Sequence, residues 1–506
     1  MSIEEVIEKP MAPEMEQLAA DLAPAAQSKT VRPSDLGDQA FLQLLGTNLR
    51  EEMDYRPEVI GNIPAALRGT LYRNGPGLFE RDGYTKKNLL DGDGLMRAWH
   101  FGDDGIRFNT RFVRTPKFIE EEEAGHYRYS TWATRTPGGP LRNLGGGRMV
   151  SQAGITVYDI NGQLMAFDEV GAPYAIDPES LETGDVVRLG PNNGDDLLAD
   201  KFAIKAHTKV LSSNGDWVCL GQSYGPTMKL HVVVTGSDGA LKHYRAYEAP
   251  RLSYIHDYAV SGRYAIAVLH PATMTPLTFL SGMESFVDSF RWRPETGNVV
   301  MVMDLAGEEP VRYLDAPASW VWHFLNAYDH GSSLVVDFVG YDEPDHFIGN
   351  EPIFATIMEG RNGNQTSPGT VRRYEIDLAR NVLRDQIIDS GNHEFPVIDP
   401  AKTGIQHQFG YFAKGEDGTF FHDGLSRIDY KSGAVETFHF GDGHYVEEPI
   451  FVPEAGGDGW VLAPVLERST EKTSLGIWNA GHLADGPVAQ VKLKHHLPIS
   501  FHGTWV

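Results

Sequence analysis

Cysteine is almost missing from this sequence, and basic residues are scarce. Cys219 is the single cysteine in 506 residues, which excludes an intrachain disulfide and suits a reducing compartment. Lysine and arginine number 44 against 69 aspartate and glutamate residues, so the formal net charge is −25. Such a charge argues against nucleic acid and anionic lipid headgroups as electrostatic partners. A hydrophobic partner is compatible with it.

Long hydrophobic runs are also absent. No stretch approaches the roughly 18 apolar residues of a membrane-spanning helix, and the first residues lack the basic and then apolar pattern of a signal peptide. We therefore expect a soluble, cytoplasmic protein. Peripheral contact with an uncharged membrane surface is compatible with the sequence, because the net charge disfavours only anionic surfaces.

Helical periodicity is rare, whereas signals for short strands are frequent. Residues 1–35 are rich in Ala, Glu and Pro and are predicted to be a disordered tail, with 36–506 as a single domain. From Val59 onward, apolar runs alternate with turn dipeptides such as Asn161-Gly162, a pattern typical of β-hairpins. Radial repetition is one of the few arrangements in which so many strands leave no long open edges, which predicts an all-β β-propeller. One amphipathic helix is expected within 271–292, packed over the propeller, with a lid or a membrane-touching surface as the alternative.

Four histidines lie in or beside strand-like runs, far apart in the sequence: His207, His256, His323 and His502. None has the spacing of a zinc motif. In a propeller, however, the inner strands of successive blades converge on the axis, where four imidazoles could hold zinc, copper, iron or nickel. Three glutamates in apolar or turn-like settings could orient the imidazoles through their second N–H groups: Glu169, Glu394 and Glu448.

Several further motifs occur in order along the chain: G-T-L-Y-R-N-G-P-G at 69–77, L-D-G-D-G-L-M at 90–96, Y-A-I-D-P-E-S-L-E-T at 174–183, E-F-P at 394–396, E-P-I-F-V-P at 448–453 and the terminal H-G-T-W at 502–505. Together they resemble the motifs of the carotenoid cleavage oxygenase family. The four histidine segments also match, and the resemblance covers roughly residues 40–506. The family includes enzymes that cleave double bonds of carotenoids, apocarotenoids, stilbenes and phenylpropenoids.

The resemblance implies a seven-bladed propeller with one non-haem Fe(II) on its axis, beneath a cap of loops and short helices. By this resemblance the four histidines are the iron ligands, and Glu169, Glu394 and Glu448 orient His256, His323 and His502 respectively. Dioxygen would be the second substrate, and the implied reaction is oxidative cleavage of an alkene to two carbonyl products. The family often has N-T-N where this chain reads A-G-I-T at 153–156.

The implied substrate is an apolar alkene in a tunnel, for which we expect Phe79, Tyr254 and Trp322 as wall residues. Asp168 stands where the stilbene and phenylpropenoid branch carries a lysine that binds a phenolic oxygen. A carboxylate there would repel a phenolate, so we expect a carotenoid or apocarotenoid in preference to a stilbenoid or phenylpropenoid. Outside enzymology, the chain could be a propeller that serves as an interaction module.

Overall fold

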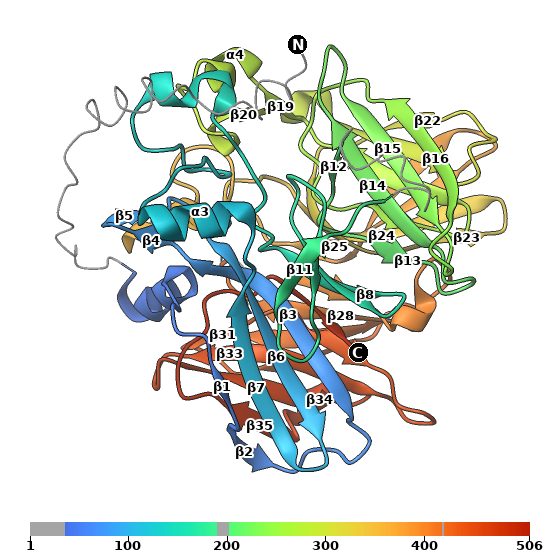
Figure 1. Ribbon diagram of the computed structural model, residues 1–506. Coiled ribbons are helices and arrows are strands. Elements are labelled where there is room, and N and C mark those ends of the chain that lie inside the picture. Colours follow the sequence, from blue (N-terminus) through green and yellow to red (C-terminus); the bar gives the residue numbers. More distant parts are fainter. Residues whose placement is uncertain (1–35, 190–201, 417–418) are drawn as a thin grey trace.

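The structure is a computed structural model that describes residues 36–189, 202–416 and 419–506. The predicted tail at 1–35 lies outside this range. Seven antiparallel sheets of four to six strands each stand around a common axis (Figure 1). The predicted seven-bladed β-propeller is therefore confirmed.

Each blade is an antiparallel sheet with an outer edge and an inner edge near the axis, and most blades run along the chain from the inner to the outer strand. The first blade contains β1 (Asp54–Tyr55), β7 (Gly105–Phe112), β6 (Asp93–Gly102), β3 (Gly69–Leu78) and β36 (His502–Trp505). The second contains β11 (Thr183–Val186), β10 (Tyr174–Ile176), β9 (Gln163–Phe167) and β8 (Thr156–Ile160). The third contains β16 (Leu241–Glu248), β15 (Lys229–Thr235), β14 (Trp217–Ser223), β13 (Lys209–Val210) and β12 (Ala203–Ile204).

The remaining blades repeat this plan. The fourth contains β22 (Arg312–Ala316), β21 (Asn298–Asp304), β18 (Tyr264–Leu269) and β17 (Ala259–Val260). The fifth contains β26 (Val382–Asp389), β25 (Thr370–Asp377), β24 (Ser333–Tyr341) and β23 (Trp320–His330). The sixth contains β30 (Val435–His439), β29 (Gly424–Asp429), β28 (Phe409–Gly415) and β27 (Asn392–Val397). The seventh contains β2 (Glu58–Gly61), β35 (Ala489–Lys492), β34 (Lys472–Asn479), β33 (Trp460–Glu467), β32 (Ile450–Val452) and β31 (His444–Val446).

Local sequence explains the blades. Asn161 and Gly162 both have positive φ (55° and 78°) in the two-residue turn between β8 and β9, as the dipeptide predicts. Middle strands such as β24 are buried on both faces because adjacent blades pack against them. Their apolar runs are therefore continuous, without the alternation of a sheet that has one solvated face.

Two strand pairings join the N-terminal and C-terminal parts of the chain and so close the ring. β2 pairs with β35 and completes the seventh blade, while β36 pairs with β3 and completes the first. In the second pairing Asn74 lies opposite His502, so the inner edge of the first blade comes from the last residues of the chain.

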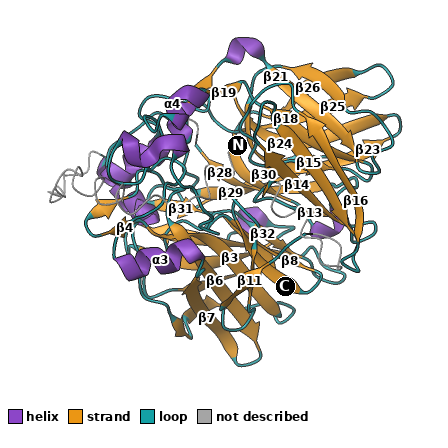
Figure 2. Cartoon of the chain, turned by 45° about the horizontal axis from the view of Figure 1, so that its top comes forward, coloured by secondary structure: helices purple, strands orange, loops and turns teal. Residues whose placement is uncertain are grey.

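Most helices and small hairpins gather on one side of the ring (Figure 2). The elements outside the blades are α3 (Pro116–Ala124), α4 (Pro276–Leu280), α5 (Ile353–Thr356), the 3-10 turns η1 (Gly37–Gly46), η2 (Pro140–Gly146), η3 (Val287–Ser289), η4 (Pro294–Thr296), η5 (Ile357–Glu359), η6 (Pro400–Lys402) and η7 (Leu483–Asp485), and the hairpins β4–β5 (Glu80–Arg81, Tyr84–Thr85) and β19–β20 (Ala272–Met274, Phe290–Trp292). None of the helices in the described ranges is long and apolar enough to cross a bilayer.

The helix expected within 271–292 is wrong as a continuous element. The segment forms the hairpin β19–β20, and only the five residues of α4 and the three of η3 are helical within its loop. Gly282, at φ +70°, follows the short helix as a left-handed residue. Phe286, Val287 and Phe290 of the segment are buried, whereas Leu277 and Met283 are exposed.

Candidate metal centre

Four blades each bring one histidine to the axis. His207 lies between β12 and β13, His256 comes shortly before β17, His323 lies within β23, and His502 is the first residue of β36. All four are buried, with exposed fractions of 4–7%. The sequence identified these histidines as candidate ligands but could not show that they meet. They lie up to about 300 positions apart, and only the closed ring brings them together at the axis.

The ligating atoms of these side chains converge. One ring nitrogen from each of the four residues lies within 4.8 Å of all the others. The Nε2 atoms of His207 and His256 are 3.2 Å apart, and so are those of His323 and His502. Two imidazoles bound to one ion at a right angle, with bonds of about 2.1 Å, would place their nitrogens about 3 Å apart.

Three glutamates fix the orientation of three of the rings. Nδ1 of His256 lies 2.7 Å from Glu169, Nδ1 of His323 lies 2.6 Å from Glu394, and Nδ1 of His502 lies 2.7 Å from Glu448. His207 differs, since its Nδ1 lies 3.3 Å from the hydroxyl of Tyr158. The structure therefore places each glutamate beside the histidine that the sequence resemblance assigned to it.

These contacts determine where the ring lone pairs point. A neutral imidazole carries one proton, and a carboxylate accepts it, so His323 and His502 donate from Nδ1 and keep a lone pair on Nε2. Those two Nε2 atoms face each other at 3.2 Å. Two lone pairs at this distance repel unless a cation lies between them. The donor set thus fits a metal ion bound by neutral imidazoles.

Burial and neighbouring charges act on these groups in opposite directions. Burial lowers the pKa of His207 and His502 well below the ordinary value, and the other imidazoles lower it further. Burial also lowers the pKa of His256, against the effect of Glu169. At His323 burial is outweighed by the Glu394 carboxylate, which raises the pKa. Three of the rings are therefore held neutral, the form that binds metal.

Lys205 contacts Glu169 and Arg73 contacts Glu448. Neither cation was predicted from the sequence. The ammonium of Lys205, 3% exposed, lies 3.0 Å from Glu169 Oε2. Burial would raise the pKa of Glu169, but Lys205 and His256 together lower it. Arg73, 0% exposed, donates to the Glu448 carbonyl at 2.9 Å and lies 3.5 Å from its carboxylate. Burial nevertheless raises the pKa of Glu448 to about 7.

Phe395 is strained beside the centre. Its φ is +51°, a left-handed conformation that costs a residue with a side chain on the order of 1 kcal/mol. Its N–H donates to the Glu394 carboxylate, and its ring stacks on His323 at 5.3 Å. The strain thus accompanies the backbone geometry that holds Glu394 and covers His323.

Asp168 faces backbone amides. One carboxylate oxygen accepts from the N–H groups of Gln152 and Ala153, at 2.7 and 3.2 Å, and the other accepts from Val170 at 2.8 Å. These bonds fix the segment at 153–156, where Ala153 has φ +48°. Thr156 follows, and its hydroxyl donates to the Ala206 carbonyl at 2.6 Å. Asp168 therefore shapes the segment that replaces N-T-N in this chain.

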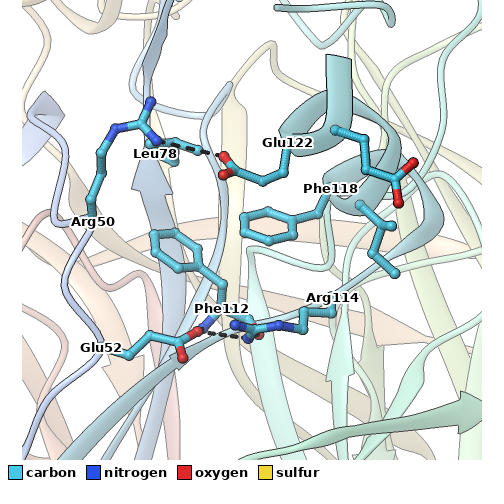
Figure 3. A pocket seen from close by; sticks show the side chains of 9 residues that line it. Arg50, Glu52, Leu78, Phe112, Arg114, Phe118 and Glu122 are labelled. Carbon is cyan, nitrogen blue, oxygen red and sulfur yellow. Dashed lines mark hydrogen bonds and ion pairs between the residues drawn. The ribbon is translucent and has the colours of Figure 1, made fainter. Parts of the chain in front are cut away.

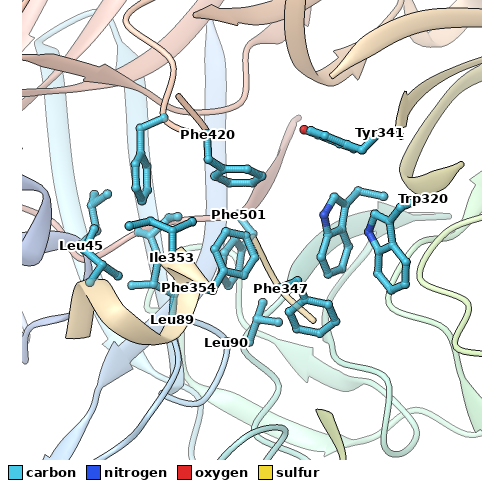
Figure 4. Packing of buried hydrophobic residues seen from close by; sticks show 14 of the residues in the cluster. Leu45, Leu89, Leu90, Trp320, Tyr341, Phe347, Ile353, Phe354, Phe420 and Phe501 are labelled. Atoms are coloured by element: carbon cyan, nitrogen blue, oxygen red, sulfur yellow. The ribbon is translucent and has the colours of Figure 1, made fainter. Parts of the chain in front are cut away.

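An apolar cluster of large side chains adjoins the centre, and we call it the central aromatic cluster (Figure 4). Its members include Trp132, Tyr254, Phe286, Phe290, Trp320, Trp322, Tyr341, Phe347, Ile353, Phe354, Phe420 and Phe501. The Trp322 ring lies 4.9 Å from His256, and the Tyr254 hydroxyl is 3.1 Å from His256 Nδ1. Two of the three expected wall residues, Tyr254 and Trp322, thus belong to this cluster. Phe79, 1% exposed, is buried outside it.

A surface pocket lies apart from this centre. A pocket of about 440 Å³ lies among β7, α3 and the segment before β1, and it is lined by none of the expected site residues (Figure 3). Its walls carry the ion pairs Arg50–Glu122 and Arg114–Glu52. Four of its charged side chains are thus engaged with one another, and the pocket has no part in the histidine centre.

The fold and the site together define a class: a seven-bladed propeller with four axial histidines and three orienting glutamates. The family model described as RPE65, retinal pigment epithelial membrane protein, matches residues 46–506, and the chain belongs to that family. The expected membership among the carotenoid cleavage oxygenases is thereby confirmed.

Characterised relatives agree with this assignment. The chain is 28% identical to the apocarotenoid-15,15′-oxygenase of Synechocystis sp., over 90% of this chain and 94% of that protein. It is also 28% identical to the isoeugenol monooxygenase of Pseudomonas nitroreducens, over 92% and 98% of the two chains. A solved structure of cobalt-substituted Synechocystis apocarotenoid oxygenase superposes with a TM-score of 0.85 at 27% identity and covers 93% of this chain and 98% of that one.

Proposed function

We propose that this protein is an Fe(II)-dependent dioxygenase that cleaves a carbon–carbon double bond of a carotenoid or apocarotenoid to two carbonyl products. The observation that carries the proposal is the convergence of four buried imidazoles, each with one ring nitrogen within 4.8 Å of the other three. His207, His256, His323 and His502 would hold the iron. A solved relative of the same fold is cobalt-substituted, which supports a metal-binding role for this protein.

Iron, when bound, would supply the chemistry that couples the alkene to dioxygen. The residues of the chain do the rest. Three glutamates orient three of the imidazoles with Nε2 toward the axis: Glu169, Glu394 and Glu448. Because these carboxylates bind the histidines, all four candidate metal ligands are imidazoles. The central aromatic cluster excludes water and offers apolar surface to a long polyene, at roughly 25 cal/mol per Å² buried.

The order of substrate classes rests on Asp168. Its carboxylate accepts hydrogen bonds from backbone amides and supplies no positive charge that could bind a phenolate. A polyene needs no such charge. Relatives named for apocarotenoid, isoeugenol and resveratrol oxygenases show that both classes occur among similar proteins. We therefore place the carotenoid or apocarotenoid first and the stilbenoid or phenylpropenoid second.

The test combines metal analysis with products. Purified protein should contain about one iron per chain, and His256→Ala should lose both iron and activity because one of four ligands is removed. Mass spectrometry after incubation with an apocarotenal, and separately with a 4-hydroxystilbene, identifies the substrate class. Full iron occupancy and normal turnover in His256→Ala would contradict the site. Turnover of the stilbene alone would reverse the order of substrates.

We also propose that the apolar surface over α4 and η2 rests on a neutral lipid surface that supplies the substrate. The side chains of Leu141, Leu144, Leu277 and Met283 are 53–78% exposed there. The two elements pack tightly, since a Cβ at Gly146 would lie 2.3 Å from the Phe279 ring. Soluble proteins rarely gather exposed apolar side chains without a partner.

A further inference from the structure

Two buried histidines close to the metal centre have ring nitrogens without partners. Within the described part of the chain, neither nitrogen of His422 has a hydrogen-bond partner, and Nδ1 of His346 has none either. The two residues are 1% and 0% exposed. Buried polar atoms are almost always paired, and an unpaired one costs about 1–3 kcal/mol, so these three atoms need an explanation.

The protonation of His346 follows from its one contact. The indole N–H of Trp322 donates to His346 Nε2 at 2.7 Å, and an indole nitrogen can only donate. Nε2 is therefore unprotonated, and the proton of the neutral ring lies on Nδ1. The nearest carboxylate oxygen, on Asp345, is 4.0 Å from Nδ1 and too distant for a hydrogen bond. His346 thus presents a buried donor without an acceptor.

His422 presents both kinds of group. A neutral imidazole has one donor and one acceptor nitrogen, and both are unpaired in this ring. An alcohol oxygen donates one hydrogen bond and accepts others. His422 therefore offers the complement of a hydroxyl, and His346, whose ring also contacts Phe420, offers a further donor. Burial supports the neutral forms, because it lowers the pKa of each ring to about 3.

Both rings adjoin the central aromatic cluster. Phe420 stacks on His346 at 4.6 Å and lies 6.1 Å from His422. Trp322 separates His346 from the ligand candidate His256, and Phe395 separates His422 from His323. Each unpaired imidazole is thus one aromatic ring away from the metal centre, on the side where an apolar chain would bind.

We propose that His346 and His422 form the polar end of the substrate site and bind a hydroxyl group carried at one end of the alkene. The inference rests on the proposed function and extends it to the substrate's end group. The same chemistry is found in a hydroxylated ionone ring of an apocarotenoid and in the phenol of a stilbenoid. Matched pairs of ligands separate these two sources.

The test uses β-apo-8′-carotenal and its 3-hydroxy derivative as one pair, and stilbene and 4-hydroxystilbene as the other. Binding is measured by quenching of tryptophan fluorescence in protein without iron, and kcat and KM are measured in iron-loaded protein under air. Wild type should bind the hydroxylated member of one pair about three- to tenfold more tightly, as expected for one or two neutral hydrogen bonds. That pair identifies the source of the hydroxyl.

His422→Phe should remove this preference, by raising KM for the hydroxylated ligand more than for the unsubstituted one. His422→Asn keeps a donor and an acceptor and should restore part of the preference. His407→Phe is the control, because His407 is also a buried histidine but lies outside the central aromatic cluster.

Equal binding of both members of each pair by wild type, or an equal loss for both in His422→Phe, would overturn the proposal and leave buried water as the partner of these nitrogens. Failure of the proposed function would differ. The fluorescence preference would then persist while no product formed from any of the four ligands.

Discussion

Lys205 places a positive charge 3.0 Å from the carboxylate that orients His256. The same carboxylate thus serves a cation on one oxygen and an imidazole on the other. The Lys205 ammonium also lies 5.4 Å from the Tyr254 ring, on the wall of the central aromatic cluster. Lys205 is a positioning residue, because it acts on the centre through Glu169.

Lys205→Met should weaken the metal site. Without the ammonium, burial raises the pKa of Glu169 toward protonation, and a neutral Glu169 loses its charge-assisted bond with His256. We expect iron affinity to fall about 10- to 100-fold, the usual cost of losing an outer partner, as measured by metal titration. Lys205→Arg should recover most of the affinity.

Lys242→Met is the matched control, because Lys242 pairs with Asp216 and is half-exposed. An iron titration of Lys205→Met that overlays the wild-type curve would show that Glu169 needs no cation.

At the scale of elements, the segment that leads into β36 is held by two buried arginines. Arg73 donates to the Ser500 hydroxyl and carbonyl, both at 2.7 Å, and Arg97 donates to the Pro498 carbonyl at 2.9 Å. Glu447, paired with Arg73 at 3.5 Å, also accepts from Ser500. The segment carrying His502 is therefore fixed by ionic hydrogen bonds as well as by the β3–β36 ladder.

Arg73→Lys should loosen this element while keeping the charge. A lysine cannot reach the carbonyl, the hydroxyl and both carboxylates at once, so several hydrogen bonds of about 0.5–1.5 kcal/mol each are lost. We expect the free energy of unfolding to fall by about 2 kcal/mol in urea melts and the iron affinity to fall with it. Arg68→Lys, an exposed partner of Asp103, should change neither. Unaltered stability of Arg73→Lys would show that the strand ladder alone holds β36.

Elements were predictable from the sequence where local chemistry decides them. The Asn161-Gly162 turn follows from its dipeptide, whereas the helix expected at 271–292 gave way to a hairpin. The ligand candidates were found because ordered motifs carry them. Lys205 and Arg73 were missed, because their carboxylate partners lie 36 and 375 residues away and no local pattern marks such pairs.

At the scale of the whole molecule, the caps give the ring two unlike faces (Figure 2). Exposed apolar side chains of α4, η2 and the residue Met283 lie on the capped face. The net charge of −25 disfavours an anionic membrane, so we expect binding to zwitterionic vesicles.

Co-sedimentation with phosphatidylcholine vesicles tests this surface. Leu277→Ser combined with Met283→Ser removes two of its most exposed apolar side chains, 78% and 64% exposed, and should reduce binding at least about tenfold. Val382→Ser combined with Ile387→Ser, on the outer strand β26, is the control and should bind normally. Equal sedimentation of the two double variants would argue against a lipid-facing role for α4.

The closure of the ring has a consequence for folding kinetics. Strand β3 must pair with β36, and β2 with β35, across more than 400 residues of chain, and contacts of such high order form late. His502 reaches the axis only through this pairing, whereas His207, His256 and His323 belong to blades formed by nearby hairpins. Metal capture therefore reports the final step of folding, and a refolding chain should acquire its secondary structure before it acquires its ion.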